Sequence, residues 1–332
     1  MSLKMCHLPS GPPPLRMNPL SLWRYLRALR KDPTGFVTNR FQTYGDLYYA
    51  KQGDSHLFVT RSPEIIGELL QTQAAKFKKT ETGRAAAHLK KFLGNGLLNS
   101  NGDFWRQQRR CVNPAFHSKK IQHYADIVVA YTERALASWK QESTFDVSKE
   151  MMDLTSKIVA KTLFDHEIQG HAERLSRAML DFREGFANTP VLPWLPTAAK
   201  RRADRSRREM HEIVMNLIQE REEEGSELEK RFDLLSALLS IKQSEDQEGM
   251  TKIQLRDEIL TLFLAGHDTT AHAITWTLFL LSQNPEAEKA VRAEIDALPS
   301  GALSFASLQH LTYTKQCLEE SMRLYPPAYV IS

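Results

Sequence analysis

The sequence predicts a mainly α-helical protein with one small β-hairpin. Helical spacing of apolar residues dominates the chain beyond residue 62, and paired β-rich runs occur only in the segment 44–62. With 332 residues, the chain is long enough to bury a sizeable core in one large domain. We therefore expect a single domain over residues 1–332, made of a leader (1–20), a hairpin (44–62) and a helical region (63–332).

The leader is rich in proline. Pro9 and the "GPPP" stretch at residues 11–14 predict an extended, stiff segment. Because the leader contains no long apolar run, we expect neither a signal peptide nor a membrane anchor in it. The stretches "PLSLWRYLRALRKDP" and "PTGFVTNRFQTYG", which follow it, have the pattern of two short helices.

The hairpin is predicted from two β-rich runs around a polar turn. Leu47–Ala50 and His56–Thr60 flank a turn that contains glycine and aspartate. Ser62 and Pro63 then have the residue types typical of the N-cap and the first position of a helix. The helical region is therefore expected to begin there.

A long central helix is marked by clear start and stop signals. Thr251 and Gln254 fit a capping box, and Pro285 cannot continue helical hydrogen bonding. At 1.5 Å per residue, a helix over 252–284 would be about 50 Å long. Since it is apolar on most sides, we expect it to run through the middle of the protein.

The charge pattern argues against nucleic acid as a partner. The formal net charge is +4, whereas a dedicated nucleic-acid binder concentrates more positive charge on one face. The basic cluster at residues 200–208 opens a predicted helix whose apolar positions keep helical spacing. We interpret it as a solvated helix face, with a binding patch as the alternative.

The cysteines and the apolar segments indicate where the protein works. Cys6, Cys111 and Cys317 are too scattered for a disulfide framework or a CxxC metal site, and they suit a reducing, cytoplasmic compartment. The most apolar segment, 259–281, carries Asp268 near its centre. A charge at that position is costly in lipid, so we do not expect this segment to span a membrane.

The stretch "AGHDTT" places small and polar residues at the centre of the apolar helix. Ala265, Gly266 and Thr269 are three and four residues apart, so we expect them on one face, where the small residues leave room for a flat ligand. Thr269 can bond to the carbonyl of Ala265 and open the helix locally for a water or a small molecule. Asp268 beside that hydroxyl is an arrangement suited to proton delivery.

This motif also has a purely structural interpretation. Gly266 can allow close packing of two helices, with Asp268 bonded to a neighbouring arginine, because short motifs are weak alone. His267 and His272 lie off the predicted ligand face. We interpret both as packed or water-bonded residues, and we predict no metal ligand among the side chains of the chain.

Two other stretches point to an anionic group. Trp105 and Arg109 in "WRQQR" are four residues apart, and both side chains only donate hydrogen bonds. Such a pair suits a cofactor carboxylate, and the alternative is a core tryptophan with an arginine stacked on it. In "EESMRLYPP", Glu320 and Arg323 can pair and brace the loop that follows, because the Pro-Pro pair ends the helix.

The order and separation of these motifs resemble one known family. A Pro-rich leader before a hairpin, then "WRQQR", "AGHDTT" and "EESMRLYPP", is the arrangement seen in the cytochromes P450, the haem-thiolate monooxygenases. The resemblance covers nearly the whole chain and looks closest to soluble bacterial-type members or their fatty-acid-hydroxylating relatives. It implies the cytochrome P450 fold, haem b with its iron as cofactor, and hydroxylation of a hydrophobic small molecule. Dioxygen and a separate electron-transfer protein (a ferredoxin, a flavodoxin or a reductase) would take part.

The resemblance also implies roles for individual residues. Ala265 and Gly266 would lie against the haem, and Asp268 with Thr269 would relay protons during oxygen activation. The donors Trp105 and Arg109 would hold the haem propionates. The structural pair would be Glu320 and Arg323. An acidic redox partner would dock near Arg106, Arg110, Lys119 and Lys120.

The substrate pocket is predicted only from rough positions in such a fold. The candidate residues are Phe182, Phe186, Leu262 and Phe263. An apolar pocket suits a fatty acid, a terpene or a steroid-like molecule.

The family's iron ligand is a cysteine in a loop F-x-x-G-x-R-x-C-x-G beyond the E-x-x-R helix, and the chain stops at "PPAYVIS". Cys6 falls in the leader, and we interpret Cys111 and Cys317 as small buried hydrophobes. Because the cysteine loop is missing, we expect a fragment or a truncated gene product. The thiolate ligand favours O–O cleavage, so the activity of this chain alone is uncertain from the sequence. The alternative function is a catalytically inactive helical module that binds a ligand or a partner.

Overall fold

The computed structural model describes residues 8–14, 18–52, 55–81, 84–139, 144–165, 174–175, 177–181, 197–225, 231–242, 250–299 and 303–330. The chain separates into two compact units, Met1–Lys78 and Lys79–Ser332. No boundary at this position was predicted from the sequence, and one domain over 1–332 stays a prediction. The predicted class, helices with one small antiparallel hairpin, is confirmed.

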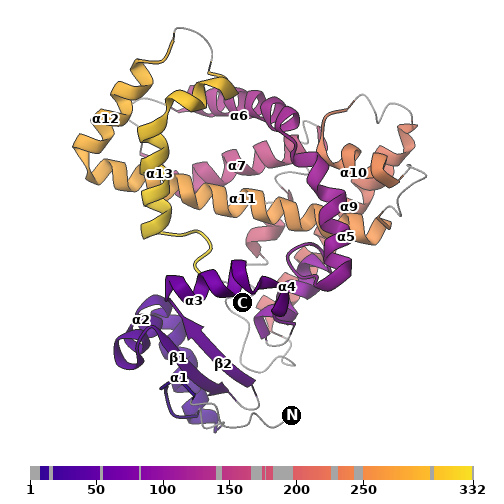
Figure 1. Cartoon of the computed structure of the whole chain (residues 1–332). Helices are drawn as coiled ribbons and strands as arrows, with labels where there is room; N and C mark the ends of the chain where they lie inside the picture. The colour runs from indigo at the N-terminus through magenta and orange to yellow at the C-terminus, as the bar shows by residue number, and fades with distance from the viewer. Residues whose placement is uncertain are drawn as a thin grey trace. The chain divides into compact units, whose positions relative to one another are not determined.

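The first unit contains the hairpin and several short helices (Figure 1). Its elements are α1 (Pro19–Lys31), α2 (Pro33–Tyr44), β1 (Leu47–Gln52), β2 (Ser55–Thr60), α3 (Pro63–Gly67), a π-helical turn (Glu68–Thr72) and a 3-10 turn (Ala74–Lys76). Both short helices and the hairpin occur where the sequence predicts them, and both strands are slightly longer than predicted.

Local capping explains where these elements begin. The Asp32 carboxylate accepts a hydrogen bond from the Gly35 amide at 2.8 Å, so one residue separates α1 from α2 and caps the second helix. The Ser62 hydroxyl caps α3 by accepting from the Ile65 amide at 3.3 Å, as predicted. A small core of Phe41, Tyr48 and Ala50 then joins α2 to the hairpin.

The second unit is helical and contains the main core. Its elements are α4 (Arg84–Leu93), α5 (Gly102–Val112), a 3-10 turn (Asn113–Phe116), α6 (Ser118–Ser138), α7 (Val147–Phe164), α9 (Ala198–Glu223), α10 (Leu234–Lys242), α11 (Lys252–Gln283), α12 (Pro285–Asp296), a 3-10 turn (Phe305–His310) and α13 (Thr312–Leu324). The predicted solvated helix corresponds to α9. Its apolar positions Met210, Ile213, Val214 and Ile218 are all buried.

The long central helix, α11, organises this unit. Its capping box is confirmed by bonds from the Thr251 amide to Gln254 Oε1 at 2.7 Å and from the Gln254 amide to Thr251 Oγ1 at 3.2 Å. Figure 1 shows α7 running alongside α11 and α13 crossing it. Helices α4 and α9 also contact α11, so it runs through the middle of this unit as predicted. Among the described residues, no helix is long and apolar enough to cross a membrane.

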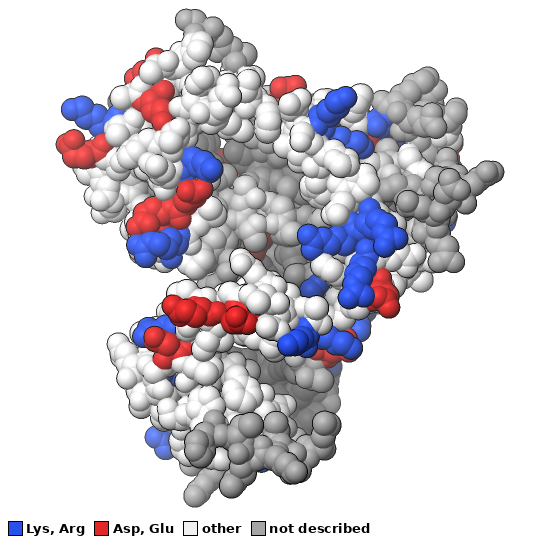
Figure 2. All heavy atoms as spheres, in the orientation of Figure 1, with Lys and Arg blue, Asp and Glu red and all other residues white. Residues whose placement is uncertain are grey.

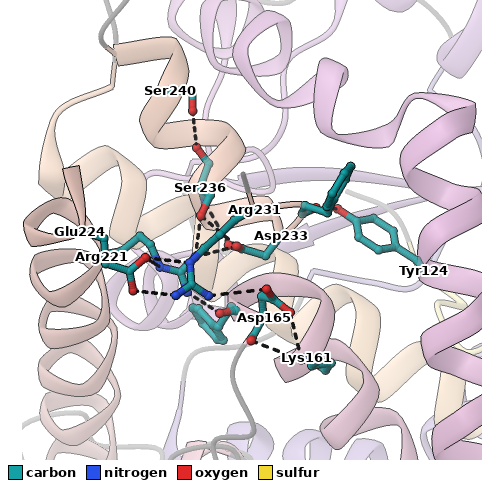
Figure 3. Close-up of polar contacts among 11 residues, drawn as sticks. Tyr124, Lys161, Asp165, Arg221, Glu224, Arg231, Asp233, Ser236 and Ser240 are labelled. Atoms are coloured by element: carbon teal, nitrogen blue, oxygen red, sulfur yellow. Dashed lines mark hydrogen bonds and ion pairs between the residues drawn. The ribbon is translucent and has the colours of Figure 1, made fainter. Parts of the chain in front are cut away.

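A buried arginine fastens three helices together (Figure 3). The Arg221 guanidinium, on α9, donates to Asp233 Oδ2 at 2.6 Å and to Ser236 Oγ at 2.5 Å, at the start of α10. It also donates to the carbonyl of Phe164 at the end of α7, at 2.5 Å. Because both charges are almost fully buried, each depends on the other for compensation.

Partly exposed charges surround this buried pair. Arg231 lies 2.7 Å from Glu224 and 3.5 Å from Asp165, and Lys161 lies 2.9 Å from the same aspartate. Nearby, the Tyr124 hydroxyl donates to the Phe232 carbonyl at 3.4 Å, and burial raises the pKa of this tyrosine to about 12. The network fixes the junction of α7, α9 and α10 through polar contacts as well as through apolar packing.

The network predicts a large stability loss for Arg221→Met. The substitution leaves the Asp233 carboxylate buried without its cation, which costs about 3–5 kcal/mol. The exposed pair Arg174–Glu209, 3.0 Å apart, offers the matched control Arg174→Met, with an expected cost below about 1 kcal/mol. Urea denaturation measures both, and equal losses would contradict a special role for Arg221.

Candidate active site

The predicted ligand face of α11 is open at its centre. The helix is covered from Gln254 to Leu264, and Ala265 and Thr269 are then exposed on one face. The Thr269 hydroxyl donates to the carbonyl of Ala265 at 2.6 Å, as the sequence predicts. The face therefore combines a small side chain with a fixed hydroxyl.

The predicted distortion of this turn is wrong. The backbone of α11 stays α-helical throughout Lys252–Gln283, including the turn at Thr269. The hydroxyl adds a bond to a carbonyl of the same helix without breaking the helix. Three other threonines of α11 donate to the carbonyl four residues earlier in the same way: Thr261, Thr275 and Thr277.

Gly266 points away from the Ala265–Thr269 face. A Cβ atom at this glycine would lie 3.0 Å from Cγ2 of Val159 on α7. The sequence placed Ala265, Gly266 and Thr269 on one face, and the structure brings together only the first and the last. The glycine allows α7 to approach α11 closely, which was the structural alternative.

His267 is packed and bonded, as interpreted from the sequence, and the interpretation of His272 stays a prediction. His267 is buried, its Nε2 bonds to the Met152 carbonyl at 3.1 Å, and its own carbonyl accepts from Thr155 at 3.1 Å. His272 Nε2 lies 3.9 Å from Asp268 Oδ1. The half-buried acid next to Thr269 therefore has a histidine beside it, on the same helix.

The donors Trp105 and Arg109 lie on the same face of α5. The Arg109 guanidinium carbon is 5.0 Å from the centroid of the Trp105 ring, and Lys79 Nζ is 5.2 Å from it. We call Lys79, Trp105 and Arg109 the donor cluster. The stacked arrangement anticipated as an alternative is thus present, and Trp105 remains half-buried with Arg109 exposed.

The donor cluster has spare capacity for an anion. Within the described ranges, no carboxylate forms an ion pair with Arg109 and no acceptor bonds to the Trp105 indole nitrogen. Burial lowers the pKa of Lys79, and the positive charge of Arg109 adds to this effect. Two cations over one tryptophan ring, together with its indole N–H, favour an anionic acceptor nearby.

Sequence reasoning missed Lys79. It belongs to the run "KFKKTE", which has the composition of an ordinary exposed loop. Its ammonium group donates to the Leu97 carbonyl, and its amide donates to Asn101 Oδ1 at 2.9 Å. Only these contacts, made over some 20 positions of sequence, bring it to the tryptophan.

The remaining predicted residues are distributed around the unit. Glu320 and Arg323 form two bonds of 2.7 Å, and this hydrogen bonding lowers the pKa of the exposed glutamate. Figure 2 shows Lys and Arg side chains gathered over α5. The docking residues named from sequence are exposed at three of four positions: Arg106, Arg110 and Lys119, with Lys120 half-buried.

The pocket prediction changes in part. Phe182 and Phe186 lie outside the described residues. Leu262 is half-buried next to the Ala265 face, whereas Phe263 is 1% exposed, belongs to the main core and stacks on His267. The structure therefore places Phe263 in the core instead of a pocket wall.

The cysteines occupy two different environments. Cys111 is buried in the main core, and burial raises the pKa of its thiol, which agrees with its interpretation as a small hydrophobe. Cys317 is half-buried on α13 and lines a groove between α11, α12 and α13. Cys6 lies outside the described residues.

Comparison with known proteins decides the family. A family model described as cytochrome P450 matches residues 9–332. The chain belongs to the cytochrome P450 family. Among its curated relatives, cyclooctatin synthase of Streptomyces melanosporofaciens is 32% identical over 92% of this chain and 66% of its own length. Pentalenene oxygenase of Streptomyces avermitilis is 29% identical over 93% of the chain and 68% of its own length. The chain spans about two thirds of the length of these P450 relatives.

Solved structures confirm the P450 fold. A retinoic-acid-bound cyanobacterial CYP120A1 superposes with a TM-score of 0.80 at 20% identity, over 96% of this chain and 70% of the other. The haem domain of cytochrome P450DA gives a TM-score of 0.73 at 20% identity, over 95% and 69%. The cofactor that the family implies is haem. The open Ala265–Thr269 face suits a flat macrocycle, and the donor cluster suits its carboxylates.

The two neighbouring small residues of the P450 motif predict stability effects of different size. Gly266→Leu forces a side chain into Val159 and should destabilise the chain by about 1–3 kcal/mol. Ala265→Leu extends from the exposed face and should change stability by less than about 0.5 kcal/mol. Chemical denaturation of both variants measures the difference, and a larger loss for Ala265→Leu would reverse the assignment of faces.

Proposed function

We propose that this protein is a haem-dependent monooxygenase that hydroxylates a hydrophobic small molecule. The observation that carries the proposal is the exposed face of α11 at Ala265 and Thr269, with the Asp268 carboxyl beside it, in a chain of the P450 family. An acid and a hydroxyl side by side on a long, largely apolar helix are suited to moving protons into a site that excludes water.

Each residue has a defined part in this proposal. The donor cluster would hold the haem carboxylates, and Ala265 would leave room for the ring. When bound, haem supplies the iron centre at which dioxygen is activated. The Thr269 hydroxyl, already donating to the Ala265 carbonyl, keeps its oxygen lone pairs free to accept from water, and Asp268 provides the exchangeable proton.

The relatives favour a terpenoid substrate. Their names state action on pentalenene and on cyclooctat-9-en-7-ol, the latter by a monooxygenase 32% identical to this chain over 96% of its length. We propose a cyclic terpenoid ahead of a fatty acid or a steroid. Electrons would come from a separate acidic protein that docks on the exposed basic residues of α5 and the start of α6.

Haem binding is tested with the protein expressed from its complete reading frame. After reduction, carbon monoxide should produce the red-shifted Soret band of a thiolate-ligated haem. Pentalenene should perturb the oxidised Soret band more strongly than a fatty acid of similar size. Failure to incorporate haem would remove the monooxygenase proposal and favour the inactive binding module.

The proton relay is tested by Thr269→Ala in the same holoenzyme. Without the hydroxyl, electrons should be consumed with peroxide released instead of hydroxylated product, and coupling should fall by about tenfold. Thr277→Ala is the matched control, because Thr277 donates to the Ala273 carbonyl at 2.7 Å two turns further along α11. The ratio of product to electrons measures coupling, and an equal ratio in both variants would exclude Thr269 from the relay.

A further inference from the structure

A loop between α4 and α5 is held by two adjacent carboxylates of α11. The loop, residues 94–101, leads directly into the helix that carries Trp105 and Arg109. The Asn95 amide donates to Asp257 Oδ2 at 2.8 Å, and the Leu97 amide donates to Glu258 Oε2 at 3.1 Å. Both acids are buried, and these bonds join segments more than 160 positions apart in sequence.

The loop fits these carboxylates closely. A Cβ at Gly94 would lie 2.1 Å from the carboxyl carbon of Asp257, and Gly94 has a φ of +70°. A Cβ at Gly96 would lie 2.3 Å from the Thr261 hydroxyl and 2.7 Å from the Asp257 carbonyl. The two glycines therefore let the loop backbone lie directly on α11.

Leu97 connects Glu258 to the donor cluster. Its amide donates to Glu258, and its carbonyl accepts from the ammonium group of Lys79, which lies over the Trp105 ring. A second link runs from Lys79 to Asn101, the residue before α5, through bonds of 2.9 and 3.2 Å. The position of the donor cluster thus depends on this loop.

Glu258 also lies on the side of α11 that carries Ala265 and Thr269. It precedes Ala265 by seven residues and Thr269 by eleven, so the three share one side of the helix. Its second oxygen, Oε1, is buried and has no hydrogen-bond partner among the described residues. A buried carboxyl with one bonded and one unbonded oxygen is an unusual way to fill a core position.

We propose that Glu258, together with Asp257, is a positioning residue that sets the donor cluster relative to the open face of α11. It acts through the backbone of residues 94–97, without touching the ligand itself. The functional value of this positioning, to hold haem, rests on the proposed function. The coupling from Glu258 through Leu97 to Lys79 and Trp105 exists in the chain alone and can be measured there.

The charges around Glu258 define its titration. Asp257 on the same helix and Lys79 and Cys111 from the packed segments face it, while Arg256 and His211 lie around Asp257. Burial raises the pKa of Glu258 to about 7. Burial lowers the pKa of His211, so that histidine should titrate below its usual range, separately from the glutamate.

The test uses fluorotryptophan NMR of the chain. The five tryptophans give separate resonances, and Trp105→Phe assigns one of them. We expect the Trp105 resonance to shift with a midpoint near pH 7, the value for Glu258. Glu258→Gln keeps an acceptor for the Leu97 amide but cannot ionise, so it should abolish this step and hold the resonance near its low-pH position.

Two further variants complete the test. Glu258→Ala removes the acceptor and should move the Trp105 resonance at every pH, whereas Glu212→Ala on the exposed face of α9 should not. If Glu258→Ala does not fold, the Glu258→Gln titration decides. A pH step that survives in Glu258→Gln, or an unmoved Trp105 resonance in folded Glu258→Ala, would overturn the proposal.

Haem titration of the complete protein separates this proposal from the functional one. Haem affinity should fall by about tenfold in Glu258→Ala and by less than about threefold in Glu258→Gln. Loss of affinity in both variants to the same extent would overturn the positioning role. If the unaltered protein binds no haem, the proposed function is wrong. The fluorotryptophan NMR result still decides whether Glu258 positions the donor cluster.

Discussion

The close packing of α7 on α11 is the constraint on which the helical unit depends. Gly266 lets the two helices approach, and the bonds between Thr155, His267 and Met152 fix their register. Helix α7 covers this side of α11, and Ala265 and Thr269 are exposed on another side of the same helix. The same helix therefore packs into the core on one side and exposes Ala265 and Thr269 on another.

Two of the buried ionic sites in the described part of this unit are built in contrasting ways. Arg221 and Asp233 compensate each other, and bonds to Ser236 and the Phe164 carbonyl complete the set. Among the described residues, Glu258 forms no ion pair and accepts from a single amide. The first arrangement is purely structural, because removing either buried charge would strongly destabilise the fold. The second leaves a carboxyl whose protonation responds to its surroundings near neutrality.

Local signals in the sequence predicted the elements well. The capping box at Thr251, the N-cap at Ser62 and the hairpin around its polar turn each depend on neighbours within a few positions, and all occur as predicted. The site was predicted less completely. Adjacent small residues look alike in a helical pattern, so the sequence could not tell that Gly266 faces α7. Lys79 approaches Trp105, and Glu258 bonds to Leu97, through contacts over distances in sequence that no periodicity reveals.

The four threonines of α11 that donate to carbonyls of their own helix have a wider consequence. Each satisfies its hydroxyl internally, so no surrounding helix has to supply a partner for it. The walls around α11 can then change shape and composition over evolution without stranding a polar atom in the interior. A scaffold of this kind can diversify what surrounds it while the helix that carries Asp268 and Thr269 remains the same.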